Sequence, residues 1–196
     1  MNDYQSGIAM CCKKLRLSYT LARHAINGQG DSNQEYLYRL LEAEITYRRE
    51  VRINKLLGTA RFPKRYGFDQ FNAKEVQLPS GTNLDTLEAL TFYEERENIV
   101  MYGGTGTGKT MLSVCIGMEA CKKEIPVRFL RTAALVNQLS ESKASGTLSR
   151  FIKKLNKASI LILDEFGYVP YDRTGSQLLF DYLSEIHENK CVILNT

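Results

Sequence analysis

The chain has 196 residues, of which 43% are hydrophobic and 24% are charged, and its formal net charge is +4. This composition is typical of a globular protein. The length suits one full-size domain, or a core domain with a smaller companion. No apolar run reaches the roughly 18–20 residues of a membrane span, and the N-terminal order of charge and apolar residues is the reverse of a secretory signal, so no membrane association is expected. Five cysteines without paired spacing argue against a disulfide scaffold and favour a cytoplasmic location, and with two histidines they also argue against a structural zinc site.

Positive charge is concentrated in the first third of the sequence. Residues 1–66 contain 12 Lys and Arg against 6 Asp and Glu, whereas residues 67–196 contain 14 against 16. A basic segment joined to a slightly acidic one is typical of a module that faces a polyanion, although a solvated helix surface explains the same imbalance.

Two helices are predicted in the basic segment. Apolar residues recur at helical spacing over residues 8–26, which predicts one amphipathic helix. Residues 32–35 (SNQE) have the form of a capping box and predict a second helix from about residue 34 to about residue 57. Three cations at i, i+4 and i+7 share one face of this second helix: Arg48, Arg52 and Lys55.

The sequence RFPKR over residues 61–65 ends the second helix and adds three further cations, Arg61, Lys64 and Arg65. We place a domain boundary after residue 66, where the sequence pattern changes. Residues 1–66 are therefore predicted to form a small all-helical domain that binds DNA or a partner.

Beyond residue 66 helices alternate with short apolar strands. Helices are predicted over residues 83–96, 109–123, 132–142, 147–157 and 173–188, and strands over residues 98–102, 126–130, 159–163 and 191–194. Strands separated by helices pair in parallel, and their nearly continuous apolar character predicts burial on both faces. The fold class predicted for residues 67–196 is α/β, a three-layer sandwich around a parallel sheet.

Residues 103–110 (GGTGTGKT) match the pattern G-x-x-x-x-G-K-[ST] at every fixed position, between a predicted strand and a predicted helix. The glycines let backbone N–H groups turn inward around a phosphate, and the following helix adds positive potential. Lys109 is expected to reach the β- and γ-phosphates of ATP, and the Thr110 hydroxyl to bind Mg²⁺. The predicted nucleotide contacts are Gly103, Gly104, Thr105, Gly106, Thr107, Gly108, Lys109, Thr110 and Met111.

A second part of the site is predicted at the end of the third strand. Asp164 lies 55 positions after Lys109, and a whole predicted strand lies between them. This inserted strand, together with the adjacent Glu165, is typical of ATPases that hydrolyse ATP with a glutamate at the end of a strand, and not of simple nucleotide kinases. Asp164 is expected to hold the Mg²⁺ shell together with Thr110. Glu165 is expected to orient and polarise the attacking water, so the predicted catalytic residues are Lys109, Asp164 and Glu165.

Motifs outside the P-loop carry a resemblance to one family. They are Arg61-Phe62-Pro63, the segment LDEFGYVP over residues 163–170, and Asp172-Arg173 followed by Leu178-Leu179-Phe180. With them the sequence resembles the insertion-sequence helper ATPases of the IstB family, relatives of the helicase loader DnaC and the initiator DnaA in the AAA+ superfamily. The resemblance covers essentially the whole chain and implies a P-loop AAA+ core behind a small helical domain.

The resemblance also implies a function. It points to an ATPase that assembles on duplex DNA as a homo-oligomer, with ATP and Mg²⁺ at the subunit interfaces, and that acts with a DDE transposase. Two alternatives stay open: a DnaC-like loader of a replicative helicase, and a DNA-binding scaffold that binds ATP without hydrolysing it. A nucleoside kinase is disfavoured because no arginine-rich phosphate lid follows the second strand.

In the family the chain continues past the fourth strand to a sensor-1 asparagine, an arginine finger and a helical lid, and this sequence is expected to lack the lid. Asn195 stands at or just before the sensor-1 position and is a candidate polar substitute. Without an arginine finger, which is worth about 10³–10⁵ in rate, nucleotide binding is expected to survive better than hydrolysis.

A basic helix is predicted between the second and third strands. The resemblance to initiators and loaders implies that this helix lines the DNA, although a solvated face is the alternative. No element resembles a base-reading module, so contacts to phosphate are expected. Its candidate DNA-binding residues are Arg150, Lys153, Lys154 and Lys157.

Overall fold

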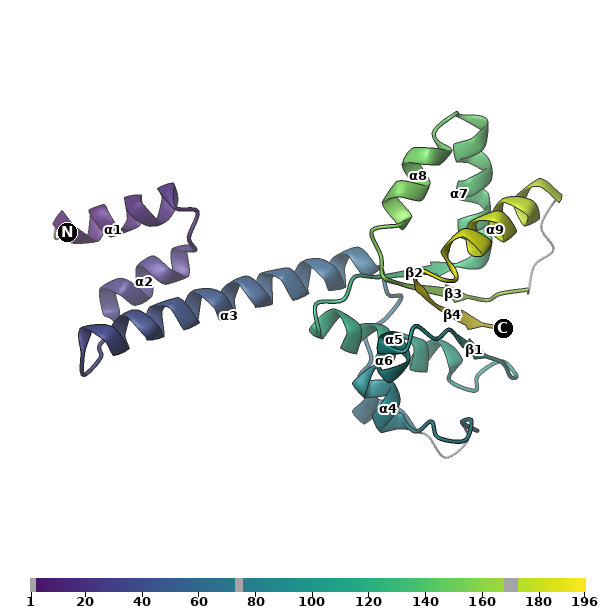
Figure 1. Ribbon diagram of the computed structural model, residues 1–196, viewed down its shortest axis with the longest axis horizontal. Coiled ribbons are helices and arrows are strands. Elements are labelled where there is room, and N and C mark those ends of the chain that lie inside the picture. The colour runs from purple at the N-terminus through teal and green to yellow at the C-terminus, as the bar shows by residue number, and fades with distance from the viewer. Residues whose placement is uncertain (1–2, 73–75, 168–172) are drawn as a thin grey trace. The chain divides into compact units, whose positions relative to one another are not determined.

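The computed structural model describes residues 3–72, 76–167 and 173–196, and the chain divides into two compact units, Met1–Lys55 and Leu56–Thr196. The first unit is all-helical and the second is an α/β domain (Figure 1). The division lies before residue 56 rather than after residue 66 because four residues beyond it pack into the α/β core: Leu56, Leu57, Ala60 and Phe62. Within the described ranges, no helix has the length and apolar character needed to cross a membrane.

Three helices contribute to the first unit: α1 (Asp3–Lys14), α2 (Tyr19–Asn27) and most of α3 (Asn33–Ala60). The start of α3 agrees with the predicted capping pattern, since the Ser32 hydroxyl accepts the Glu35 N–H (3.1 Å). The core is small. Its buried residues are Cys12, Leu21 and Ala22, and they pack against Ile8, Leu17 and Leu40.

The single helix predicted over residues 8–26 is wrong, because the chain turns between α1 and α2. At this turn Arg16 adopts a left-handed backbone conformation (φ 55°), and the Leu17 N–H donates to the Cys12 carbonyl (2.8 Å). This is the hydrogen-bond pattern of a helix C-terminal cap. Ser18 then begins α2 by accepting the Leu21 N–H (3.0 Å).

The turn is held to α3 by a buried carboxylate. Glu44 is 6% exposed and accepts the Ser18 N–H (3.1 Å) and the Ser18 hydroxyl, as well as Nε of Arg48 (2.7 Å). The Arg48 guanidinium also donates to the Arg16 carbonyl (2.8 Å). Burial alone would raise the pKa of Glu44, but the hydrogen bonds from Ser18 and Arg48 outweigh it and lower the pKa. The ionised carboxylate therefore stabilises this unit at neutral pH.

In its described residues, the second unit is a parallel sheet of four strands between two helical layers. The strands are β1 (Ile99–Met101), β2 (Val127–Arg131), β3 (Ile160–Asp164) and β4 (Cys191–Asn195), in the spatial order β1-β4-β3-β2. The helices are η1 (Phe68–Gln70), α4 (Leu84–Ala89), α5 (Thr91–Glu94), α6 (Lys109–Lys122), α7 (Thr132–Ala144), α8 (Leu148–Leu155) and α9 (Arg173–Ile186). The predicted α/β sandwich is confirmed, except that the helix expected over residues 83–96 is divided at Leu90 (φ 66°).

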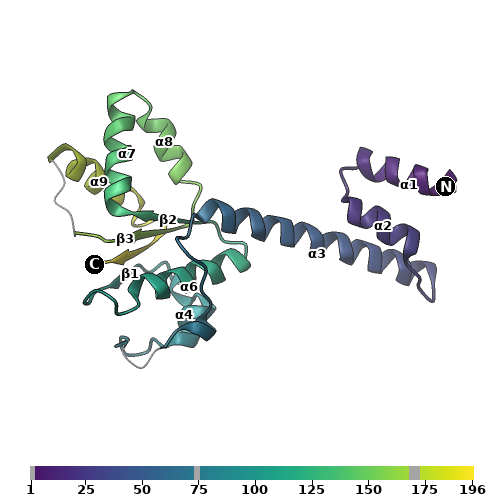
Figure 2. The same ribbon diagram turned by 180° about the vertical axis from the view of Figure 1, so that it is seen from behind.

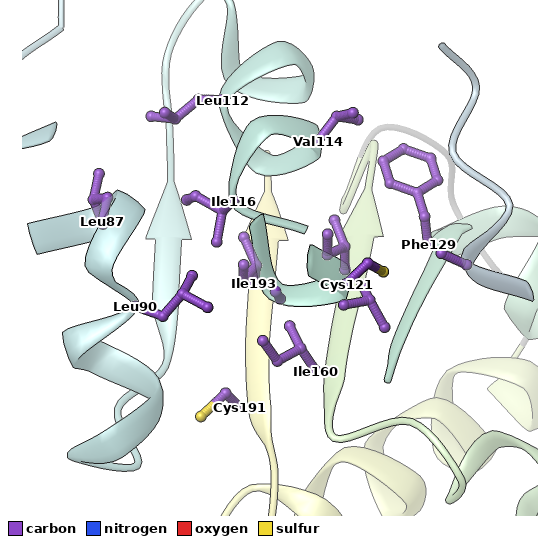
Figure 3. Close-up of a cluster of buried hydrophobic side chains, with 14 of the residues drawn as sticks. Leu87, Leu90, Leu112, Val114, Ile116, Cys121, Phe129, Ile160, Cys191 and Ile193 are labelled. Carbon is purple, nitrogen blue, oxygen red and sulfur yellow. The ribbon is translucent and has the colours of Figure 1, made fainter. Parts of the chain in front are cut away.

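Alternate strand residues feed two separate cores. Figures 1 and 2 show α4 and α6 on one face of the sheet and α7, α8 and α9 on the other. Ile160 and Ile162 of β3 belong to the α6 core, whereas Leu161 and Leu163 belong to the core beneath α7 and α9. Figure 3 shows the first core, in which Ile116 of α6 lies among the buried strand residues. Burial on both faces holds β3 rigidly, and β3 carries the predicted catalytic acid.

Phe62 of the RFP motif joins the end of α3 to this core. Its ring packs edge-to-face against Phe129 (centroids 6.4 Å apart) and lies over Gly117 of α6. A Cβ on Gly117 would come within 2.7 Å of the Phe62 ring and 3.0 Å of Ile162, so glycine is required for this close approach. The Arg61-Phe62-Pro63 motif, which supported the family resemblance, therefore packs through Phe62 against α6, the helix that follows the glycine-rich loop.

We predict that Gly117→Ala lowers the free energy of unfolding by about 1–3 kcal/mol, because Phe62 must move to admit the methyl group. The matched control is Gly58→Ala in α3, where nothing lies within 4 Å of the added Cβ. This control should stabilise the chain by about 0.5–1 kcal/mol through helix propensity. Urea unfolding followed by circular dichroism measures both, and equal midpoints would contradict the packing role of Phe62.

Candidate functional site

A glycine-rich loop joins β1 to α6 at the carboxyl edge of the sheet. Gly103 (φ 149°), Gly106 (φ 87°) and Gly108 (φ 88°) adopt backbone conformations that other residues rarely take. The Thr107 hydroxyl closes the loop by donating to the Gly104 carbonyl (2.9 Å). The loop leads into the first turn of α6, whose free N–H groups and positive dipole end favour an anion.

Lys109, the first residue of α6, directs its ammonium group over the loop. Nζ donates to the carbonyls of Gly103 (2.6 Å) and Gly104 (2.7 Å). An anion bound at the loop would therefore meet a positive charge that is already held in place. Of the other predicted contacts, Thr105 is exposed in the loop and Met111 is half-buried in the first turn of α6.

Asp164 ends β3 directly beside α6, and its side chain is 7% exposed. Its two carboxylate oxygens accept the Thr110 hydroxyl at 3.0 and 3.1 Å, so the two predicted metal ligands lie together. Its backbone carbonyl accepts the Thr132 hydroxyl (2.8 Å) at the start of α7. The acid is thus fixed by groups from two helices.

Asn195 at the end of β4 is part of the same cluster and is 1% exposed. Its Nδ2 donates to Oδ1 of Asp164 (2.8 Å) and to Oγ of Ser113 (2.9 Å). Sequence reasoning treated Asn195 only as a candidate and missed Ser113 altogether. The signals in the sequence were weak: a polar residue at the end of a fourth apolar strand, and one hydroxyl in the apolar stretch of α6.

Glu165 follows Asp164 in a strained turn. It has a left-handed backbone conformation (φ 56°), and the next N–H, of Phe166, donates to the Asn195 carbonyl (2.7 Å). The Glu165 side chain is 53% exposed, and its Oε2 lies 3.8 Å from Nε of Arg131 at the end of β2. Arg131 was not predicted; it reaches Glu165 because it stands opposite Asp164 in the β2–β3 register.

A segment before the α/β core also borders the loop, and sequence reasoning missed it. A Cβ on Gly108 would lie 3.2 Å from the Phe71 ring. Nearby, the Cys115 thiol of α6 donates to the Gly67 carbonyl (3.3 Å), and burial, assisted by the charge of Asp69, raises the thiol pKa to about 11. The thiol therefore stays protonated at neutral pH and helps to hold this segment against α6.

The predicted DNA-binding residues lie in both units. In the first unit Arg48 is bound to Glu44, and Arg52 and Lys55 are exposed further along α3. In the second unit Arg61 has a positive φ (60°), and the Lys64 ammonium lies 5.3 Å from the centre of the Tyr66 ring. Arg65 is exposed.

The remaining candidates are on and after α8. Arg150 and Lys153 line a polar pocket of about 400 Å³ with Gly146, Thr147 and Ser149. Lys154 and Lys157 are exposed, and Lys157 lies beyond the end of α8, which stops at Leu155. The family motif residues Tyr168, Val169, Pro170 and Asp172 lie outside the described residues.

Comparison with known proteins identifies a family of similar sequences. A sequence model of the family described as "IstB-like ATP binding protein" matches residues 13–196. A relative named as an ATP-binding protein of insertion sequence IS5376, from Geobacillus stearothermophilus, is 33% identical over 84% of this chain and 66% of its own, so the chain spans just under two thirds of that relative.

Solved structures show the same fold. AMPPCP-bound DnaA from Aquifex aeolicus has a TM-score of 0.55 at 20% identity, over 69% of this chain and 43% of its own. The DnaC helicase loader has a TM-score of 0.50 at 21% identity, over 66% of this chain and 76% of its own. The second unit therefore has the AAA+ fold.

We predict that Lys109→Ala weakens ATP binding about 10- to 100-fold, because it removes a charged hydrogen-bond donor worth about 1.5–3 kcal/mol. The matched control is Lys122→Ala, in the last turn of the same helix, where the ammonium pairs with Glu119. Titration with a fluorescent ATP analogue measures both variants. Equal affinities of the two variants for the analogue would show that Lys109 does not contribute to nucleotide binding.

Proposed function

The chain belongs to the family of IstB-like ATP-binding proteins, and from this premise we propose that it is an ATPase that assists transposition, assembling on duplex DNA and acting with a DDE transposase. One observation carries the ATPase part: the side chains of Thr110, Asp164 and Asn195 meet at the carboxyl ends of β3 and β4. Basic residues in both units support the DNA part. The insertion-sequence relative supports the transposase part.

ATP would place its phosphates in the loop of residues 103–108, against backbone N–H groups and the Lys109 ammonium. The Thr110 hydroxyl and the Asp164 carboxylate are hard oxygen donors within hydrogen-bond distance of each other, which suits the coordination preferences of Mg²⁺. Bound there, Mg²⁺ would neutralise charge on the phosphate oxygens. The AMPPCP-bound DnaA supports an adenine nucleotide in a fold of this kind.

Hydrolysis requires a group that orients water toward the γ-phosphorus. Glu165 is suited to this role, since its carboxylate is half exposed next to Asp164. Its positive φ costs of order 1–3 kcal/mol, and such strained positions cluster at functional sites. The carboxylate would accept a proton from the water as the water oxygen bonds to the γ-phosphorus and the bond to the β–γ bridging oxygen breaks.

DNA binding would come from contacts to phosphate. The cations on α3 and on α8 are exposed, and neither helix resembles a base-reading module. In a homo-oligomer with ATP at the subunit interfaces, each subunit would present the same cations to the duplex. Weak contacts in each subunit would then add up to stable binding.

We predict that Glu165→Gln retains ATP binding but lowers turnover at least 100-fold, because the amide cannot accept the proton of the attacking water. The matched control is Glu119→Gln, near the C-terminal end of α6, where the carboxylate pairs with Lys122. Phosphate release measures turnover, with and without duplex DNA. Equal turnover of parent and Glu165→Gln would exclude Glu165 as the catalytic base, and binding without any turnover in the parent would favour a scaffold.

We predict that DNA affinity depends on salt and that removing cations lowers the log–log salt slope by about 0.9 for each DNA phosphate that is no longer neutralised. Two double variants test this, Arg52→Ala with Lys55→Ala, and Lys153→Ala with Lys154→Ala. Arg48 is left intact because its loss would remove the cationic partner of the buried Glu44 carboxylate. The measurement is binding to a labelled duplex at several NaCl concentrations, with Lys122→Ala as control; unchanged slopes in both variants would make these cations ordinary solvated surface.

A further inference from the structure

Ser113 is a buried hydroxyl in the middle of an apolar helix. It is fully buried on α6, between Leu112 and Val114, which are also buried. The hydroxyl donates its one hydrogen to the Thr110 carbonyl three residues earlier (3.0 Å). This leaves the oxygen of Ser113 able only to accept a hydrogen bond.

The hydrogen bond that Ser113 accepts comes from the Asn195 amide. Nδ2 of Asn195 has two hydrogens, of which one is directed to Ser113 Oγ (2.9 Å) and the other to Asp164 Oδ1 (2.8 Å). Neither partner has a hydrogen to offer, since the Ser113 hydrogen is engaged and the carboxylate carries none. Two acceptors on one side therefore force the nitrogen of the amide, and not its oxygen, to face them.

The amide oxygen of Asn195 is left on the opposite side. Oδ1 is buried and has no hydrogen-bond donor among the described residues. A buried carbonyl without a donor is unfavourable, so a conformation that keeps one has to be enforced by its neighbours. Ser113 and Asp164 enforce this conformation, because both accept a hydrogen bond from Nδ2 of Asn195.

We propose that Ser113 is a positioning residue, which holds the Asn195 amide with Nδ2 on the Asp164 carboxylate and thereby keeps that carboxylate in place beside Thr110. This inference rests on the proposed ATPase function for its consequence in catalysis. The Asp164 carboxylate is the proposed Mg²⁺ ligand together with Thr110, so the hydrogen bond from Asn195 would fix the ligand that catalysis needs. Ser113 itself touches neither water nor nucleotide; it acts through Asn195.

Ser113→Ala should lower kcat about tenfold, the effect of losing roughly one hydrogen bond in orientation, while KM and the affinity for an ATP analogue change less than twofold. Ala is a good helix former, so the variant should fold. Ser113→Thr keeps a hydroxyl that can bond the same i−3 carbonyl and should restore most of the kcat. The matched control is Ser140→Ala, a half-buried serine of α7, which should leave both constants unchanged.

A double-mutant cycle separates action through Asn195 from action on the loop. If Ser113 works by orienting the amide, Ser113→Ala should have no further effect on kcat in an Asn195→Ala background. Additive losses would show that Ser113 acts on the phosphate loop through the Thr110 carbonyl, and the proposal would be wrong.

A second measurement needs no ATP turnover. In a ¹⁵N-labelled chain the Asn195 side-chain NH₂ signals can be assigned by their loss in Asn195→Ala. Their hydrogens should exchange slowly with solvent in the parent and at least tenfold faster in Ser113→Ala. Unchanged exchange would overturn the positioning role. Faster exchange in a chain that does not hydrolyse ATP would keep the role of Ser113 toward Asn195 and reject the ATPase function instead.

Discussion

The buried carboxylate of Asp164 is the interaction on which the site depends. Removing a charge from water is costly unless hydrogen bonds replace its hydration. Here the replacement comes from the Thr110 hydroxyl of α6 and the Asn195 amide of β4, and the Asp164 carbonyl binds Thr132 of α7 as well. One side chain therefore sets the relative positions of the phosphate-loop helix and of two neighbouring strands.

The sheet explains why these groups meet. Its strands are parallel and share one carboxyl edge, so residues far apart in sequence are brought to neighbouring strand ends. Thr110 and Asp164 could be predicted because each belongs to a recognisable local pattern. Asn195 and Ser113 could not be placed from the sequence, because their roles depend on the pairing of β3 with β4 and on which face of α6 is buried. Arg131 could not be placed from the sequence either, because its position opposite Asp164 depends on the pairing of β2 with β3.

The breaks in the helices were missed for a local reason. Arg16 and Leu90 adopt positive φ where the sequence has no glycine, so the usual marker of a left-handed turn is absent. The hydrophobic spacing on either side continues at helical period and favours one long helix. Strands and the remaining helices were predicted well because burial on one or both faces leaves a strong pattern in the sequence. Arg48 was predicted as a DNA-binding cation on the helix surface. Its ion pair with Glu44 shows that it also stabilises the first unit.

The helical first unit also has an unusual surface for its size. Of the fourteen large hydrophobic side chains that are well exposed among the described residues, eleven lie in residues 1–55, including Leu37, Leu41 and Ile45 along α3. The same segment is rich in cations. Electrostatic attraction and apolar adhesion therefore act on one small surface, and they respond to ions in opposite ways. Screening weakens attraction to polyanions, whereas strongly excluded salts such as sulfate strengthen apolar adhesion. We therefore expect the choice of anion in the buffer, and not ionic strength alone, to affect whether this unit stays dispersed or clusters.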